Sequence, residues 1–572
     1  MKRPCVVDSS IQFNPEGQLA IPPLPRRRFL RGLAATAAGL TCADFLGYFK
    51  AYGLPDDSKA SRLAQDATEA NDDPHFLVYW YLEGGWCGYD MFNPVMTGNN
   101  VLNRLENISE ERYRVTQWGD EDYGIYKHGN IRYGYLASEG KDLFKDMAVL
   151  GSMHTGSGHS RDRLKVHMGD YKFRQTEERE DDERSVMQAF AEVYGQNYVL
   201  PNLSWHWWLS DGELNEVQYA GRRGYYHALG PAHAHTLYGG TPAKLKKLLL
   251  RMQEEAGDTI SRRIESFLDS AHDEFLKDEN IDAVKSYNSA REIYQQMAQR
   301  GQKLDRNRIE KLFENPALKE EFQISTDDEL ITYRSVNGNK ARSKFSPNTN
   351  VQAMMSYELM REAMSCAFFI ETRDVRRFDS HLSRKRLWKD DGAPKGMPDQ
   401  TQMMKDDLWH PIQAFVSRLK NTEYKATGTS LYDHTQIVIT SEFGRSLHGN
   451  VDRIQKKDAS DEKKEKEIGD QDICAHWKVT SCAFLGGKVQ GDRQFGGAGE
   501  KTLMAIPIMA DGSLDPNYDP LTGELLPDRE KHPESFIPNH GDVYATALHL
   551  SDIDPKGRGR NTRPPMKFIK RA

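Results

Sequence analysis

Several short runs of consecutive apolar residues stand out along this chain, and each run is followed at once by glycines or charged residues. The first run, Phe76–Leu82, ends at Glu83 and two glycines. Three further runs reach about Met153, begin the segment 365–381, and cover Ile437–Ile439. Because side chains alternate between the two faces of a strand, runs that are apolar at successive positions predict strands buried on both faces, as in a parallel sheet.

Helical patterns lie between these runs. A glycine-rich turn follows Met153, and we expect a helix from about Ser160. Apolar residues recur at steps of three and four over about 260–275 and 287–297, which predicts a pair of amphipathic helices in a helical insertion over about 242–330. Strands that alternate with helices are typical of the α/β class. We expect one α/β domain over 74–572, with a linker before it at 44–73 and a charged surface loop at 452–472.

The first 43 residues have the pattern of a targeting segment. Arg26 and Arg27 are followed by Arg28, Phe29, Leu30 and Arg31, and then by small apolar residues from Gly32 to Leu40. This run is too short for a transmembrane helix and fits the apolar region of a signal peptide. The arrangement resembles a twin-arginine export signal. We therefore expect a periplasmic or extracellular protein whose partner during export is the twin-arginine translocase. Cleavage of the signal and its retention in the membrane both stay open.

Composition narrows the class of protein. The 572 residues are 38% hydrophobic and 28% charged, and no tract is long enough to span a bilayer, so we expect no transmembrane span in the mature chain. The net charge of −7 argues against a nucleic-acid partner, because such proteins neutralise phosphates with basic residues. Six cysteines, two of them in the signal region, make no disulfide framework and no C-x-x-C metal spacing.

Polar residues cluster just past the predicted strands. The carboxyl ends of strands are where open α/β sheets bind ligands, so side chains at these places are candidates for chemistry. The candidates are Glu83 with Asp90; His154, His159 and Arg163; Asp379 and His381; Glu442 and Arg445; and His476. Carboxylates together with imidazoles are the ligands of Zn²⁺ or Mn²⁺, and mainly oxygen ligands suit Ca²⁺ or Mg²⁺. The sequence predicts a divalent metal site and leaves the metal open.

Five segments resemble a family of exported bacterial proteins that is defined by a domain of unknown function (number fifteen-oh-one). Its motif W-L-x-G-G-x-x-x-x-D-x-F-x-P is similar to Tyr81–Gly85 followed by Asp90, Phe92 and Pro94. Its W-D-T-H is similar to Phe378–His381, and its G-E-F-G-R to Ser441–Arg445. Its D-H-W is similar to Ala475–Trp477, and its D-x-x-A-T-x-L-H-L to Asp542–Leu550. The similarities run in order over about 76–556 and are weak through the helical middle.

That family in turn is similar to the alkaline phosphatase and sulfatase superfamily. The resemblance implies an alkaline-phosphatase-like three-layer sandwich with a central, mostly parallel sheet. It implies a divalent metal held by Asp379, His381, Glu442 and either Glu83 or His476, while Arg163 and Arg445 hold the anionic group of the substrate.

The chain departs from the superfamily pattern at two positions. Phe443 stands where a second metal ligand is expected. His159 stands where the superfamily has its nucleophile at a helix N-terminus, and no C-x-P-x-R motif occurs. His159 is thus a catalytic candidate that could bind metal or attack phosphorus itself, or its presence could mean that ester chemistry is lost.

Two functions follow from these observations. The first is an exported metal-dependent hydrolase of phosphate or sulfate esters, with a small anionic ester or a glycan as substrate. The alternative is a non-catalytic exported protein that keeps the fold and binds an envelope partner or a glycan.

Overall fold

The computed structural model describes a central sheet and helices that pack on it. The described residues are 12–13, 19–20, 75–86, 88, 91–94, 126–156, 158–169, 185–195, 198–205, 235–236, 241–256, 304–325, 330–332, 345–372, 404–425, 427–445, 476–499, 503–558 and 563–571. The chain divides into one unit at Met1–Gly53 and a second at Leu54–Ala572. In the first unit, β1 (Gln12–Phe13) pairs antiparallel with β2 (Leu19–Ala20). The rest of the expected signal, the linker at 44–73 and the charged loop at 452–472 lie outside the described residues.

The second unit is built on a sheet of eight strands. In spatial order these are β16 (Arg493–Phe495), β6 (Met147–His154), β15 (Val479–Gly486), β12 (Thr435–Ser441), β3 (Phe76–Leu82), β11 (Ala367–Thr372), β7 (Asn202–Ser204) and β8 (His235–Thr236). All neighbours pair in parallel except β15, which is antiparallel to both β6 and β12. The prediction of an α/β protein with a mostly parallel central sheet is confirmed.

The four apolar runs are four of these strands. β3, β11 and β12 are buried along their whole length. β6 is buried except at its last residue, His154, which is exposed. Continuous burial explains the continuous apolar runs, because neither face of such a strand meets water. The strand predictions are confirmed.

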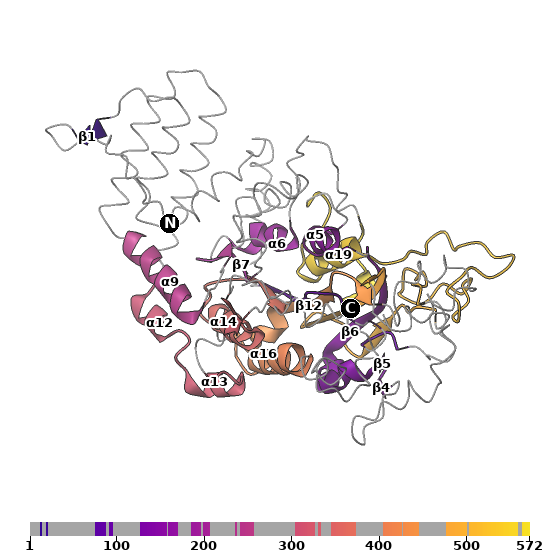
Figure 1. Ribbon diagram of the computed structural model, residues 1–572, viewed down its shortest axis with the longest axis horizontal. Coiled ribbons are helices and arrows are strands. Elements are labelled where there is room, and N and C mark those ends of the chain that lie inside the picture. The colour runs from indigo at the N-terminus through magenta and orange to yellow at the C-terminus, as the bar shows by residue number, and fades with distance from the viewer. Residues whose placement is uncertain are drawn as a thin grey trace, which may run out of the picture. The chain divides into compact units, whose positions relative to one another are not determined.

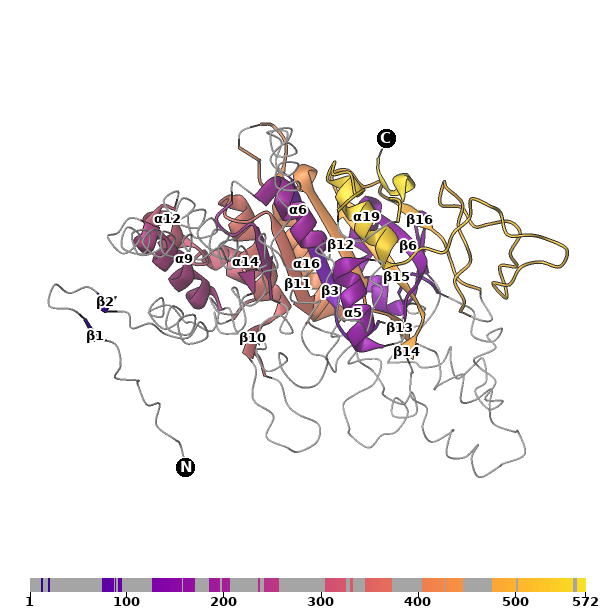
Figure 2. The same cartoon turned by 90° about the horizontal axis from the view of Figure 1, so that it is seen from above.

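Helices cover both faces of the sheet (Figure 1, Figure 2). One face carries α5 (His159–Met168), α6 (Val186–Tyr194) and α19 (His540–Leu550), and the other carries α14 (Thr349–Arg361) and α16 (His410–Lys420). The ring of His167 on α5 stacks on Phe369 of β11, with centroids 4.2 Å apart. Trp80 of β3 meets Phe415 of α16 on the opposite face, with centroids 6.2 Å apart. These contacts define three layers: helix, sheet and helix.

The remaining elements are mostly short, and α9 is the longest of them. They are α9 (Pro242–Ala256), α12 (Arg306–Lys311), α13 (Pro316–Glu321), β4 (Tyr126–His128), β5 (Ile131–Tyr133), β9 (Leu330–Thr332), β10 (Phe345–Pro347), β13 (Gly444–Arg445), β14 (His476–Trp477), the 3₁₀ helices η4 (Tyr135–Asp146), η11 (Leu431–His434) and η12 (Lys567–Ile569), and the π-helical turn η10 (Lys405–Trp409). Within 242–330 the structure has α9, α12, α13 and the first residue of β9, while the amphipathic pair expected over 260–297 lies outside the described residues. Among the helices that are described, none has the length and apolar character needed to cross a membrane.

Candidate functional site

Three glutamates meet at the carboxyl ends of the three central strands β12, β3 and β11. Glu442 and Glu83 directly follow Ser441 and Leu82, which are register partners at the ends of β12 and β3. Glu371 lies in β11 and is the register partner of Tyr81. All three glutamates are fully buried. Parallel pairing therefore brings carboxylates from distant parts of the sequence to one edge of the sheet.

These glutamates face the helix α5. Phe369 contacts α5, and Glu371 lies two residues further along the same strand, so the two side chains share a face. Arg163 reaches down from α5, forms an ion pair with Glu83, and places its Nε 3.9 Å from Glu442 Oε1. The guanidinium is buried with the carboxylates. We call Glu83, Glu371 and Glu442 the carboxylate cluster.

The pKa values of two neighbouring side chains show that these groups belong to one electrostatic unit. Burial works to lower the pKa of Arg163, but the charges of Glu83, Tyr81, Glu442 and Glu371 outweigh it and raise this pKa above its ordinary value. The pKa of Tyr81 is raised well above its ordinary value, first by burial and then by Glu442, against the opposing effect of Arg163. Charges removed from water interact strongly, so a change in the charge of one of these groups shifts the pKa values of the others.

Glu442 is held by its surroundings. The backbone N–H of Gly84 donates to its Oε1 at 2.8 Å. The hydroxyl of Ser441 lies 3.1 Å from Oε2 and 2.6 Å from the carbonyl oxygen of Leu82, and can donate its proton to either. His540, at the start of α19, donates from Nε2 to the carbonyl oxygen of Glu442 at 3.1 Å. Burial lowers the pKa of His540 to about 4, so the ring is neutral near pH 7.

Arg445 has a different environment from Arg163. Its Nε donates to the carbonyl oxygen of Gly85 at 3.1 Å, and Nη2 donates to that of Gly84. The guanidinium lies over the ring of Phe443, 5.2 Å from the centroid, and is 1% exposed. Arg445 thus holds the two-glycine turn that follows β3, and its predicted contact with an anionic group stays a prediction.

The carboxylate of Asp162 binds backbone N–H groups of the loop between β6 and α5. Asp162 accepts hydrogen bonds from the backbone N–H groups of Gly156 at 3.0 Å and Gly158 at 2.8 Å, and Lys165 Nζ lies 3.0 Å from it. A helix N-terminus offers such N–H groups to anions. Here the amides of the preceding loop are already engaged by Asp162.

The structure brings together some of the predicted site residues. Glu83, Glu442 and Arg163 are in contact. His476 and Arg445 are register partners of β14 and β13, and the His476 ring lies 4.3 Å from that of Phe443. His154 ends β6 next to Asn539, and the pKa of His154 is lowered, mainly by burial.

Other predicted residues cannot be placed. Asp379, His381 and Asp90 lie outside the described residues, as does the side chain of His159, the first residue of α5. Among the side chains that are described, no three of His, Cys, Asp or Glu are arranged to hold a metal ion.

Sequence reasoning did not select Glu371, His540 or Tyr81. Glu371 interrupts an apolar strand in the segment AFFIET, which is an unusual place for a charge and was a usable signal. His540 follows Asn539, and Asn539 with Asp542 forms a capping box, so the spacing N-x-x-D marks the helix start that places His540. Tyr81 stands in the segment that resembles W-L-x-G-G, but a tyrosine in a buried strand is ordinary and gives no signal of its own.

The fold and the cluster define a mixed α/β protein with a buried, charged edge at the carboxyl ends of its central strands. Searches against family models, curated proteins and solved structures give no match to this chain.

Proposed function

We propose that the protein is an exported metal-dependent hydrolase of phosphate or sulfate esters with an alkaline-phosphatase-like fold. The observation that supports it best is the contact of the buried Glu83 and Glu442 with Arg163 at the carboxyl edge of the sheet. Buried carboxylates are costly unless they are paired or coordinate a metal. The three-layer arrangement with a mostly parallel sheet supports the proposed superfamily.

The proposed metal site combines two described carboxylates, Glu83 and Glu442, with predicted ligands that lie outside the described residues. Carboxylate oxygens of Glu83, Glu442 and Asp379 would provide hard ligands for Mg²⁺, Mn²⁺ or Ca²⁺, and the imidazoles predicted at His381 and His476 would shift the preference toward Zn²⁺ or Mn²⁺. We propose that Glu83 and Glu442 hold the ion together with Asp379 and His381. When bound, such an ion polarises an ester oxygen and lowers the pKa of a bound water.

In this proposal Arg163 is the residue that binds the anionic group of the substrate. Its guanidinium is planar and always charged, and it suits the oxygens of phosphate and sulfate. If Glu83 and Glu442 held a cation, the charge of Glu83 would no longer depend on Arg163 for compensation. The guanidinium is then available to the ester group at the same edge.

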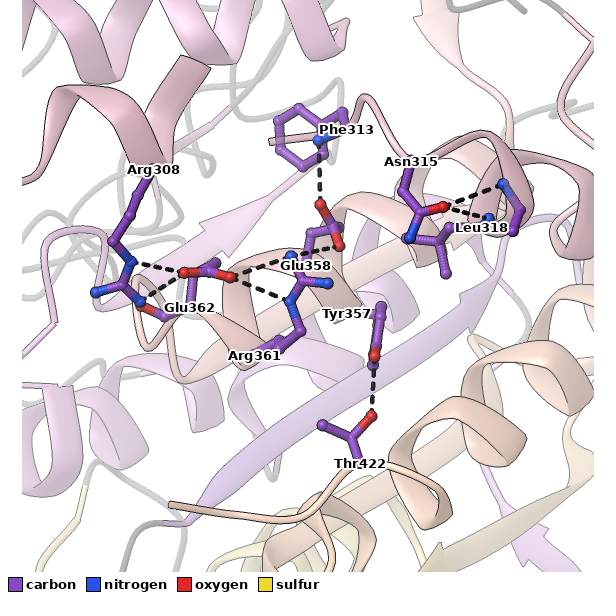
Figure 3. Close-up of polar contacts among 10 residues, drawn as sticks. Arg308, Phe313, Asn315, Leu318, Tyr357, Glu358, Arg361, Glu362 and Thr422 are labelled. Carbon is purple, nitrogen blue, oxygen red and sulfur yellow. Dashed lines mark hydrogen bonds and ion pairs between the residues drawn. The ribbon is translucent and has the colours of Figure 1, made fainter. Parts of the chain in front are cut away.

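The first experiment measures binding of Mn²⁺ alone to the purified protein by isothermal titration calorimetry. We expect about one or two ions per chain and at least tenfold weaker binding in Glu442→Gln, because a ligand oxygen is lost. Glu358→Gln is the matched control. Glu358 is also a buried glutamate, but it lies on α14 and pairs with Arg361 at 3.0 Å (Figure 3). Absence of Mn²⁺ binding in the unchanged protein contradicts the metal assignment.

The second measurement tests catalysis on a panel of aryl phosphates, phosphodiesters and aryl sulfates. We expect turnover with at least one class, reduced at least a hundredfold in Glu442→Gln and unchanged in Glu358→Gln, because ligand loss removes the charge stabilisation of the transition state. Turnover that is equal in all three proteins would show that the activity belongs to another site or to a contaminant.

A non-catalytic exported protein that binds a glycan or an envelope partner is the second candidate. Two observations favour it: Phe443 is fully buried at the place of the expected second ligand, and Asp162 engages the loop amides before α5. Mn²⁺ binding without turnover on any ester of the panel is the outcome that this candidate predicts.

A further inference from the structure

Three basic side chains, those of His154, Lys165 and Lys478, lie around the loop between β6 and α5. His154 ends β6 and is the register partner of Val479, so Lys478, which directly precedes β15, lies beside the start of this loop. The N–H of Thr155 donates to the carbonyl oxygen of Lys478 at 2.7 Å and holds the two segments together. Because β6 and β12 are both antiparallel to β15, this loop lies at the same edge of the sheet as the carboxylate cluster.

The acidic group nearest to these three cations has both of its oxygens occupied. Asp162 is fully buried, accepts from the N–H groups of Gly156 and Gly158, and has Lys165 Nζ 3.0 Å away. Within the described part of the chain, neither His154 nor Lys478 has a carboxylate at ion-pair distance. Positive charge therefore exceeds negative charge around this loop.

The pKa of His154 shows that the three groups interact with one another. Burial lowers this pKa first, the charges of Lys478 and Lys165 lower it further, and Asp162 only partly opposes them. Like charges that repel one another all attract an anion that lies between them. His154 is exposed and Lys165 and Lys478 are partly exposed, so such an anion can reach them from the solvent.

This group of cations adjoins the candidate site but faces a different direction from Arg163. Arg163 and Lys165 are two residues apart on α5, and residues at that spacing do not share a face of a helix. The side chain of Arg163 is 6% exposed and lies with the glutamates, whereas that of Lys165 is 25% exposed. The pKa of His540, which binds the carbonyl oxygen of Glu442, is affected by Lys165 as well as by Glu442. Arg163 and Lys165 thus address different parts of one ligand.

We propose that His154, Lys165 and Lys478 bind a second anionic group of the substrate, one that is not hydrolysed. This inference rests on the proposed function. It narrows the substrate to esters that carry a further negatively charged group, such as a second sulfate or phosphate.

The first test is calorimetric titration with inorganic sulfate at low ionic strength. We expect the unchanged protein to bind sulfate and Lys478→Gln to bind it at least about fivefold more weakly, because a charge-assisted contact is lost. Lys127→Gln is the matched control, since it removes the same charge at an exposed position on β4 and should bind within about twofold of the unchanged protein. Absence of sulfate binding, or equal binding in all three proteins, overturns the inference.

The second test compares 4-nitrophenyl phosphate and sulfate with analogues that carry a sulfonate on the ring. We expect Lys478→Gln to raise KM for the sulfonated ester at least about fivefold, with kcat and the simple ester unaffected, because the lost contact is made equally in the ground and transition states. An unchanged KM for the sulfonated ester overturns this inference and leaves the hydrolase proposal standing. If neither kind of ester is turned over, the hydrolase proposal fails, and the sulfate titration still supports or overturns the anion site.

Discussion

Phe443 and Gly85 illustrate at the scale of single residues how tightly the site is packed. A Cβ added at Gly85 would lie 2.4 Å from Phe443 Cε2 and 3.2 Å from Arg445 Nε, and Gly85 also has a φ of +82°. The ring of Phe443 therefore rests on the Cα of a residue that has to be glycine for two reasons. The phenylalanine that replaces an expected ligand is part of the packing that holds Arg445 and the turn after β3.

We predict that Gly85→Ala lowers the free energy of unfolding by about 3 kcal/mol or more, because strain at positive φ and overlap with a buried ring add together. Urea denaturation measures this change. Gly428→Ala separates the two causes, since Gly428 has a φ of +77° but open space around its Cα. We expect Gly428→Ala to lower the free energy of unfolding by about 1 kcal/mol. If Gly85→Ala and Gly428→Ala lower the free energy of unfolding equally, the overlap with Phe443 does not contribute to the loss in Gly85→Ala.

At the scale of elements, the sequence predicts the features that are marked by a pattern within one short segment. β3, β6, β11 and β12 follow from continuous apolar runs, and α5 follows from the glycine-rich turn before it. The strand order is set by contacts between distant segments, so periodicity could not reveal that β3 lies between β12 and β11 or that β15 runs antiparallel.

The same distinction explains which residues of the site could be predicted from the sequence. Glu83 and Glu442 stand just after apolar runs and were found, whereas Glu371 lies inside a strand whose extent past β7 is known only from the pairing. Gln352 lies on the helix α14 and its side chain hydrogen-bonds to the backbone of Glu371 in β11, which no spacing in one segment can show.

Residues of α14, and the residue that follows it, also make polar contacts with α12 and with the turn after it (Figure 3). Glu358 accepts a hydrogen bond from the N–H of Phe313 at 3.1 Å, in the turn between α12 and α13, and pairs with Arg361. Glu362, which directly follows the last residue of α14, pairs with Arg308 of α12. Burial raises the pKa of Glu358, and Arg361 and the bond from Phe313 only partly oppose the effect.

We predict that Glu358 makes the protein less stable as the pH rises. Because the folded pKa is raised, the folded state binds the proton more tightly, so this contribution is fully present below the ordinary value near 4.5 and is lost as the pH rises through the folded value. Glu358→Gln should remove this part of the slope, which urea unfolding at several pH values between about 4 and 7 measures. Glu310→Gln, at an exposed position on α12, is the control. Parallel pH profiles for Glu358→Gln and the unchanged protein would contradict the prediction.

At the scale of the whole molecule, the cluster exists only after the chain has folded. Glu83, Glu371 and Glu442 lie up to 359 positions apart in the sequence and meet through the pairing of β3 with β11 and β12. The proposed export route, which carries folded proteins, would allow such a site to form and to take up the proposed metal before export. The twin-arginine pattern at Arg26 and Arg27 and the proposed site are therefore consistent with each other.

We predict that changing both Arg26 and Arg27 to lysine stops export while leaving the folded domain intact, because the translocase recognises the arginine pair. The measurement is the fraction of protein in the periplasm of a bacterial host after cell fractionation, which should fall at least tenfold. Arg31→Lys is the control, because it makes the same substitution outside the pair and should not reduce export. The retained double variant, purified from the cytoplasm, should bind Mn²⁺ as the exported protein does. Normal export of the double variant would contradict the twin-arginine assignment, and loss of Mn²⁺ binding in the retained protein would show that the site is completed only after export.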